Sequence, residues 1–170
     1  SLRKLYQDNG YKDVVVKDPV LETFVVNPKE TRPEKVKRRV RMTIPIAEGE
    51  RFTFGTVTVD GAVLYPADRL VRAFTYKPGK ALSRGILTEG MKTIDAIYRG
   101  RGYIYVFMNP EYTEKPGNVV DVSIKLTEGD QYRLGRIEFT GNKTTRDKVL
   151  RREMQLFEGD ILDMESFRKG

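Results

Sequence analysis

The sequence predicts an α+β protein built as a tandem array of modules, each with its elements in the order β-α-α-β-β. The first observation is that EGERFTFGTVTVDG, residues 48–61, recurs as EGDQYRLGRIEFTG, residues 128–141. The second is that LRKLYQDNGY, residues 2–11, recurs as IDAIYRGRGY, residues 94–103. Glycines and large apolar residues that recur in register indicate a repeat architecture. With 39% apolar and 32% charged residues, the chain has the composition of a folded protein.

The two pairs of segments divide the chain into repeats. One pair is offset by 80 residues (128 − 48 = 80) and the other by 92 (94 − 2 = 92). The first copy therefore holds 12 extra residues (92 − 80 = 12), which we assign to an enlarged hairpin connection within residues 17–35. We expect residues 1–50 to be the C-terminal half of one module, 51–130 a complete module, and 131–170 the N-terminal half of the next.

The complete module should begin with a strand and a helix. Phe52–Val59 alternates apolar and polar residues and ends at the turn signal Asp60–Gly61. Pro66–Tyr76 has apolar residues on one helical stripe, a proline in its first turn, and Pro78–Gly79 beyond its end. The corresponding residues of the third unit predict the same strand and helix there.

A second helix and two strands should complete the module. Ser83 is the expected N-cap of a helix that stops at Gly100. The apolar stripe of this helix should consist of Ile86, Leu87, Met91, Ile94, Ile97 and Tyr98. The strands Tyr103–Tyr112 and Val119–Leu126 should follow, joined by a turn at residues 114–118. Alternate residues of the last strand are apolar, so we expect the helices to cover that face: Val120, Val122, Ile124 and Leu126.

Composition argues against catalysis. The chain has no cysteine and no histidine, which excludes disulfides, thiol nucleophiles, imidazole bases and nearly all zinc chemistry. The carboxylate pairs Glu48/Glu50 and Glu128/Asp130 repeat at strand ends without a base or nucleophile beside them. We therefore predict that the chain is not an enzyme and that it has no catalytic residue, metal site or cofactor.

The net charge of +7 raises the alternative of a nucleic-acid-binding repeat. The excess is spread thinly along the chain, and the densest basic run, residues 35–41, alternates in part with apolar residues as a half-exposed strand would. Tyr103, Tyr105 and Phe107, beside two arginines, could form a stacking platform for single strands. Packing of the module explains these residues as well, so we expect no nucleic-acid partner.

The repeated motifs resemble the POTRA domain, the polypeptide-transport-associated module. The resemblance covers essentially the whole chain and implies that each module is a three-stranded mixed sheet covered on one face by two helices. The motif that leads from a helix into a strand appears twice, as Leu5–Tyr6 with Gly10–Tyr11 and as Ile97–Tyr98 with Gly102–Tyr103. The last strand of a module, which ends in Glu–Gly, also appears twice, as Val40–Gly49 and Val120–Gly129.

FTGNKTTRDKVLRREMQLFEGDIL, residues 139–162, is similar to the start of the last POTRA module in the BamA family of outer-membrane assembly factors. That resemblance implies a scaffold in the periplasm of a bacterium, beside the membrane, followed by a membrane barrel that is absent here. It implies unfolded outer-membrane β-barrel precursors and accessory lipoproteins as partners. The alternative within the fold is the POTRA array of a secretion transporter or another membrane-biogenesis protein.

The resemblance also implies that the strand after the second helix lies at an edge of the sheet. An exposed edge can accept an extended chain as a further strand, whatever that chain's sequence. Pro110 would limit the pairing because it has no N–H group. The alternative is that the apolar residues of this strand pack inward and the edge stays empty. We expect polypeptide binding at seven residues: Tyr103, Ile104, Tyr105, Val106, Phe107, Met108 and Asn109.

The resemblance also implies a docking site for a lipoprotein at Arg151 and Glu158 in the last module. Arg151 follows an apolar helical pair, and Glu158 lies in the loop before Gly159. The alternative is a solvated arginine and a glutamate in a cap or turn, which contribute little to stability. Arg152 and Glu153 are expected to form ordinary surface pairs.

The half-modules at the two ends should leave apolar faces uncovered. Residues 131–170 of one copy could complete residues 1–50 of another, because they correspond to complementary halves of a module. We therefore expect self-association through swapped half-modules, or else frayed ends.

Overall fold

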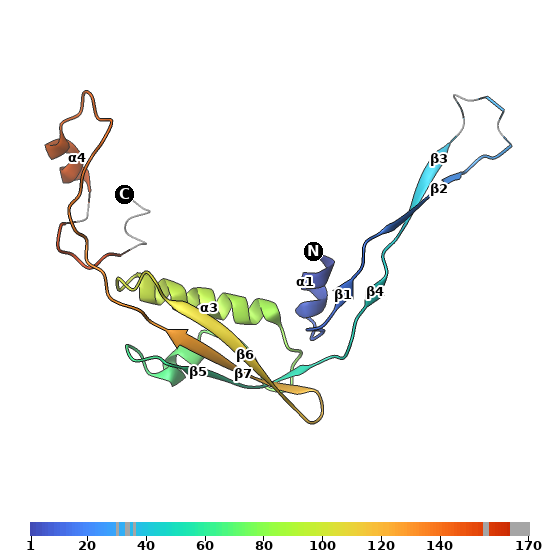
Figure 1. Ribbon diagram of the computed structural model, residues 1–170, viewed down its shortest axis with the longest axis horizontal. Coiled ribbons are helices and arrows are strands. Elements are labelled where there is room, and N and C mark those ends of the chain that lie inside the picture. Colours follow the sequence, from blue (N-terminus) through green and yellow to red (C-terminus); the bar gives the residue numbers. More distant parts are fainter. Residues whose placement is uncertain (30, 33–34, 36, 155–156, 164–170) are drawn as a thin grey trace.

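The computed structural model describes residues 1–170 except 30, 33–34, 36, 155–156 and 164–170. Figure 1 shows an extended molecule with a hairpin at one end, a module of sheet and helices in the centre, and a smaller C-terminal unit. The elements in chain order are α1 Leu2–Gln7, β1 Val15–Val16, β2 Val20–Val25, β3 Arg38–Thr43, β4 Ile46–Ala47, β5 Thr53–Asp60, α2 Ala67–Val71, α3 Arg84–Arg99, β6 Phe107–Lys115, β7 Val119–Thr127 and α4 Asp147–Glu153.

The central module is a three-stranded mixed sheet in the order β5-β7-β6. β7 is parallel to β5 and antiparallel to β6. The helices α2 and α3 lie on one face of this sheet (Figure 1). Four alternate residues of β7 face them and are 0–5% exposed, namely Val120, Val122, Ile124 and Leu126. The predicted α+β fold class and the covered face of the last strand are confirmed.

A β-bulge interrupts the alternation of β5. Phe54 and Val57 are both buried although they are three residues apart, because the register with β7 shifts between them. Asp121 on β7 accepts a hydrogen bond from the Thr56 N–H at 2.7 Å. A Cβ atom on Gly55 would overlap the carboxylate of Asp121. The glycine in the middle of this strand is therefore what lets Asp121 approach the bulge.

α3 is the long helix of the core. Ser83 is its N-cap, as predicted, and its hydroxyl accepts from the Ile86 N–H at 3.3 Å. Ile94 and Tyr98 are fully buried beneath the sheet face. Ile97, which we expected on the apolar stripe, is instead 41% exposed.

α2 is shorter than predicted and ends at Val71 rather than Tyr76. The residues that follow have to reach the outer edge of β5, where the Gly79 N–H donates to the Phe54 carbonyl at 2.7 Å. A helix continued to residue 76 would carry the chain away from this edge. The predicted boundary was wrong because backbone pairing outweighs helical propensity here.

Among the described residues of the N-terminal unit, no helix covers the β2–β3 hairpin. β2 pairs with β3 over six residues, and every residue of both strands is exposed. Leu21, Val40 and Met42 are each 58–59% exposed. Residues 38–41 of the basic run lie in β3, so a strand is confirmed there, but it is exposed on both faces rather than half-exposed as expected.

The C-terminal unit repeats part of the central module. The isolated bridge Arg133–Ile161 matches the bridge Thr53–Ala81 at the same offset (133 − 53 = 80). α4 lies within residues 146–156, the equivalent of the helix predicted at 66–76, but it ends at Glu153, and residues 155–156 lie outside the described part. Residues 134–140 form no strand, contrary to the prediction. In the central module the equivalent strand pairs with β7, and within the described residues nothing pairs with 134–140 in that way.

Candidate polypeptide-binding edge

The two edges of the central sheet differ. Along β5, residues 79–82 run beside the strand and seal its first half with backbone hydrogen bonds. The Phe54 N–H donates to the Lys80 carbonyl at 2.8 Å, and the Leu82 N–H donates to the Phe52 carbonyl at 2.9 Å. Farther along, the Tyr76 hydroxyl accepts from the Val57 N–H at 3.2 Å. An incoming chain would have to displace these groups to pair with β5.

The edge of β6 is free in the described part of the chain. β6 pairs with β7 continuously from Phe107↔Thr127 to Lys115↔Val119, and no other described segment forms backbone hydrogen bonds with it. Pro110 has no N–H to give to β7, so its nitrogen is expected to face outward, as in edge strands generally. Along an antiparallel strand the outward orientation recurs at every second residue. We therefore expect the backbone groups of Met108 and Tyr112 to face the free edge.

The predicted binding segment is only partly a strand. Phe107, Met108 and Asn109 lie in β6, whereas the strand was wrongly predicted at four residues before it: Tyr103, Ile104, Tyr105 and Val106.

The contacts that follow the end of α3 explain why residues 103–106 form no strand. Gly102 has φ +83°, and the Tyr103 N–H bonds back to the Tyr98 carbonyl at 3.1 Å. The Tyr103 ring packs edge-on against Tyr98, with centroids 5.8 Å apart, and Val106 packs against the same core. Residues 103–106 therefore form the connection between α3 and β6, although their alternating pattern alone predicts a strand.

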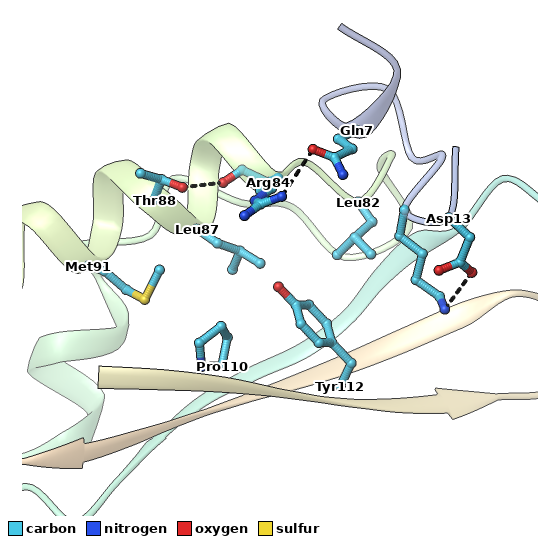
Figure 2. Close-up of a pocket in the computed structure, with 10 residues that line it drawn as sticks. Gln7, Asp13, Leu82, Arg84, Leu87, Thr88, Met91, Pro110 and Tyr112 are labelled. Carbon is cyan, nitrogen blue, oxygen red and sulfur yellow. Dashed lines mark hydrogen bonds and ion pairs between the residues drawn. The ribbon is translucent and has the colours of Figure 1, made fainter. Parts of the chain in front are cut away.

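A groove of about 550 Å³ runs between the β6 edge and α3. Figure 2 shows Leu87 and Met91 from α3 on one side of it and Pro110 and Tyr112 from β6 on the other. Gln7 and other residues of the N-terminal unit close one end. The lining residues are Gln7, Lys12, Asp13, Leu82, Arg84, Leu87, Thr88, Met91, Pro110 and Tyr112.

The charged groups at the closed end are paired with one another. The Lys12 ammonium lies 2.8 Å from the Asp13 carboxylate and 2.7 Å from the Glu114 carboxylate at the end of β6. The Arg84 guanidinium donates to the Gln7 side-chain carbonyl at 3.2 Å. Burial raises the pKa of the Tyr112 hydroxyl, although Arg84 opposes this effect. The groove therefore has an apolar interior and a neutralised rim.

Arg151 and Glu158 lie together in the C-terminal unit. Their side chains form an ion pair at 3.0 Å, and each also binds the backbone of Ile137. The Glu158 carboxylate accepts the Ile137 N–H at 3.0 Å, and Arg151 donates to the Ile137 carbonyl at 2.6 Å. The Ile137 N–H, followed by Arg151, lowers the pKa of Glu158. Arg152 pairs with Glu153 at 3.4 Å, the ordinary surface pair expected.

Sequence reasoning missed a hydrogen-bonded centre around Glu128. Its carboxylate accepts the hydroxyl proton of the fully buried Tyr98 at 2.7 Å. It also accepts the N–H groups of Val63 and Leu64 at 2.7 and 2.8 Å. Burial opposes the charge of Glu128, but these hydrogen bonds prevail and lower its pKa. The signal was present in the repeated Leu–Tyr and Glu–Gly motifs, whose tyrosine and glutamate meet in space.

Neither metal-binding groups nor membrane-spanning helices are found in the part of the chain that the structure describes. Within those residues no three acidic side chains gather in a way that could hold a metal ion. None of the described helices is long and apolar enough to cross a bilayer.

Comparisons with known proteins agree with this geometry. BamA of Neisseria meningitidis serogroup B, named an outer membrane protein assembly factor, is 29% identical over 166 residues, which cover 96% of this chain and 20% of that protein. BamA of Neorickettsia risticii is 30% identical over 72% of this chain and 17% of its own length. The chain thus spans about a fifth of these relatives. The crystal structure of Haemophilus influenzae BamA POTRA3-5 matches with a TM-score of 0.72 and 21% identity, and the match covers 98% of this chain and 63% of that chain.

The POTRA family model, described as surface antigen variable number repeat, matches residues 52–129 and 132–170. The resemblance to POTRA domains of the BamA family, expected from the sequence, is confirmed. With more than half of its residues matched by that model, the chain belongs to the POTRA family.

Proposed function

We propose that the chain is part of the periplasmic scaffold of an outer-membrane protein assembly factor. In this role it binds unfolded β-barrel precursors as an added strand on β6 and docks accessory lipoproteins near Arg151 and Glu158. It acts without catalysis, as a chaperone-like platform. The names of its relatives and its POTRA modules support this assignment.

The free edge of β6 is the observation that carries the proposal. No described segment other than β7 pairs with the backbone of β6, whereas the outer backbone groups of β5 are bonded to the chain's own residues 79–82. Main-chain pairing depends little on side chains, which suits a scaffold that receives many different precursors. The Lys12–Glu114 ion pair closes the far end of the edge, so an added strand is expected to stop before residue 114.

Replacing Tyr112 with proline tests this edge. The change removes one outward N–H group, and we expect binding of a barrel-strand peptide to fall about tenfold, the effect of about one hydrogen bond. Tyr112→Val is the matched control, because it removes the same side chain and keeps the N–H. Fluorescence anisotropy of a labelled peptide measures the affinity.

A second arm uses the peptide itself. Methylation of alternate backbone nitrogens should abolish binding, whereas scrambling the side chains should leave it largely intact. Equal affinities of Tyr112→Pro and Tyr112→Val, together with indifference to methylation, would refute strand addition at β6.

Arg151 and Glu158 bind each other, so either residue could act by contacting the lipoprotein or by supporting the local fold. The test of docking has to separate these two roles. Arg151→Glu and Glu158→Arg should each abolish lipoprotein capture. The double exchange restores the internal ion pair with reversed charges at the surface. We expect it to remain inactive in a pull-down if the pair touches the partner directly. Recovery of capture in the double variant would show that the pair only supports the local fold.

The division into modules at 1–50, 51–130 and 131–170 remains our proposal, and so does self-association through the uncovered halves. The apolar face of the β2–β3 hairpin supports it, with Leu21, Val25, Val40 and Met42 all 41–59% exposed. We expect sedimentation velocity to show a concentration-dependent dimer. We also expect Val40→Lys to shift it to monomer by placing a charge in that face. A monomer at every concentration would dismiss the swap.

A further inference from the structure

The chain contains two joints between successive units, and their backbone contacts are the same. At the first joint the Phe52 N–H donates to the Gly10 carbonyl at 2.8 Å. At the second, the Tyr132 N–H donates to the Gly102 carbonyl, also at 2.8 Å. Both glycines have positive φ, and in each case an added Cβ would lie 2.6 Å from the carbonyl oxygen of the facing aromatic residue. The same backbone hydrogen bond therefore occurs at both joints.

The side chains at the two joints differ. At the first joint, Asp8 at the C-cap of α1 reaches the start of α3 in the next unit. Its carboxylate accepts the Gly85 N–H at 2.6 Å and the Ser83 hydroxyl at 3.2 Å. The equivalent of Asp8 at the second joint is Gly100 (8 + 92 = 100), and the equivalent of Ser83 is Asp163 (83 + 80 = 163). The second joint thus has no carboxylate on the helix end that precedes it.

Asp8 satisfies a backbone donor of α3 from outside the module. A carboxylate bound to the N–H groups of a first helical turn is favoured by both the hydrogen bond and the helix dipole. Gly85 makes this approach possible, since a Cβ there would lie 2.8 Å from the carboxylate oxygen. Asp8 therefore joins the end of α1 to the beginning of α3, next to the hydrogen bond from Arg84 to Gln7.

We propose that Asp8 is a positioning residue that holds the preceding unit against α3 and so closes the groove beside β6. The part that concerns the groove rests on the proposed function of β6. Gln7, Lys12 and Asp13 line the closed end and belong to the segment that Asp8 anchors. The Lys12 ammonium also lies 4.7 Å from the centre of the Phe52 ring, at the joint itself. Release of Asp8 lets the end of the groove swing away from the free edge.

Spin labels measure the joint directly, because the chain has no cysteine of its own. Thr23→Cys on the hairpin and Thr75→Cys after α2 are exposed positions on either side of the first joint. In the Asp8→Ala variant we expect a broader distribution of label-to-label distances by pulsed electron paramagnetic resonance. Asp8→Asn should keep the narrow distribution, since its amide oxygen accepts the same N–H. Asp18→Ala, which removes an exposed aspartate of the same unit, is the control.

The peptide assay for β6 supplies a readout that a purely structural role would leave unchanged. Asp8→Ala should weaken binding about three- to tenfold, the effect expected from one lost capping contact, with α3 helicity and the unfolding midpoint of the central module retained. An unchanged distance distribution in Asp8→Ala would refute the proposal that Asp8 holds the preceding unit against α3. A broadened distribution with unchanged peptide affinity would refute the link to the groove. If the unaltered chain binds no peptide, the proposed function of β6 fails. The distances between the spin labels still test whether Asp8 holds the joint.

A gain-of-contact variant tests the same idea at the second joint. Gly100→Asp together with Asp163→Ser and Glu165→Gly copies the three residues of the first joint, since Glu165 is the equivalent of Gly85 (85 + 80 = 165). Labels at Thr75→Cys and Lys148→Cys should then show a narrower distance distribution. Gly100→Asp alone should not, because a Cβ at Gly100 lies 3.9 Å from the Asp163 carboxylate and two like charges would meet. An unchanged distribution in the triple variant would show that a carboxylate at residue 100 does not hold the second joint.

Discussion

Replacement of Glu128 with alanine is expected to lower the free energy of unfolding of the central module by about 2–4 kcal/mol. The change removes one carboxylate that accepts three hydrogen bonds, from the Tyr98 hydroxyl and from the N–H groups of Val63 and Leu64. Tyr98 is fully buried, so its hydroxyl would lose its acceptor where water does not reach. Urea denaturation followed by circular dichroism measures the loss.

Graded variants separate the contributions around Glu128. Tyr98→Phe removes the hydroxyl and keeps the ring, and we expect it to cost about 1–2 kcal/mol. Glu128→Gln keeps an accepting oxygen and should cost less than Glu128→Ala. Glu111→Ala is the matched control, because Glu111 is an exposed glutamate whose nearest cation, Lys125, lies 4.0 Å away. A loss for Glu128→Ala no larger than that for Glu111→Ala would contradict the role of this centre.

The same carboxylate predicts how stability depends on pH. Its folded-state pKa is lowered from the ordinary value of 4.5, so the unfolded chain binds more protons in the window just below that value. The stabilisation is present above about pH 4.5 and is lost as the pH falls through the folded-state pKa. Urea midpoints measured between pH 7 and pH 3 should fall less steeply for Glu128→Gln. Parallel curves for the two proteins would contradict this assignment.

The Glu128 centre explains why two short motifs recur far apart in the sequence. Tyr98 ends the Leu–Tyr-like motif of α3, and Glu128 opens the Glu–Gly motif after β7. In the N-terminal unit the equivalent residues are Tyr6 and Glu48, and a hydrogen bond to Glu48 raises the pKa of Tyr6. Each pair ties the helix that carries the tyrosine to the end of the strand before the Glu–Gly motif. The motifs therefore mark a contact that closes the module.

Periodicity was sufficient to predict most of the central module. Alternation identified the four buried residues of β7, and the helical stripe with its Ser83 cap identified α3, because burial on one face leaves a regular pattern. The boundaries of α2 and β6 could not be predicted in this way. Both depend on backbone bonds to distant segments, such as Gly79 to Phe54 and Tyr103 to Tyr98.

The candidate site was harder to predict than the fold. Strand order, and hence the free edge of β6, followed from the resemblance rather than from the residues themselves. The groove was not predictable, because its lining comes from three separate stretches of chain that include Gln7, Leu87 and Pro110. Asp8 left no local signal at all, since an aspartate after a helix is ordinary until the next unit is placed against it.

Gly61→Ala is expected to cost about 3–5 kcal/mol, which combines backbone strain with overlap against a fixed carbonyl. Gly61 has φ +89°, and an added Cβ would overlap the Leu126 carbonyl oxygen. That oxygen cannot move aside easily, because β7 is held between β5 and β6. The turn after the first strand therefore requires glycine for two separate reasons.

Gly79 separates these two reasons within the same module. It has φ +75°, but nothing lies within 4 Å of an added Cβ, so Gly79→Ala should cost only the strain, about 1–2 kcal/mol. The difference between the two variants in urea unfolding measures the overlap with Leu126 alone. Equal losses would mean that the chain after β5 relaxes away from β7. In that event the positive φ angle alone would explain why glycine recurs at Gly141, the equivalent of Gly61. The close contact between Gly61 and Leu126 would then contribute nothing to the stability of the module.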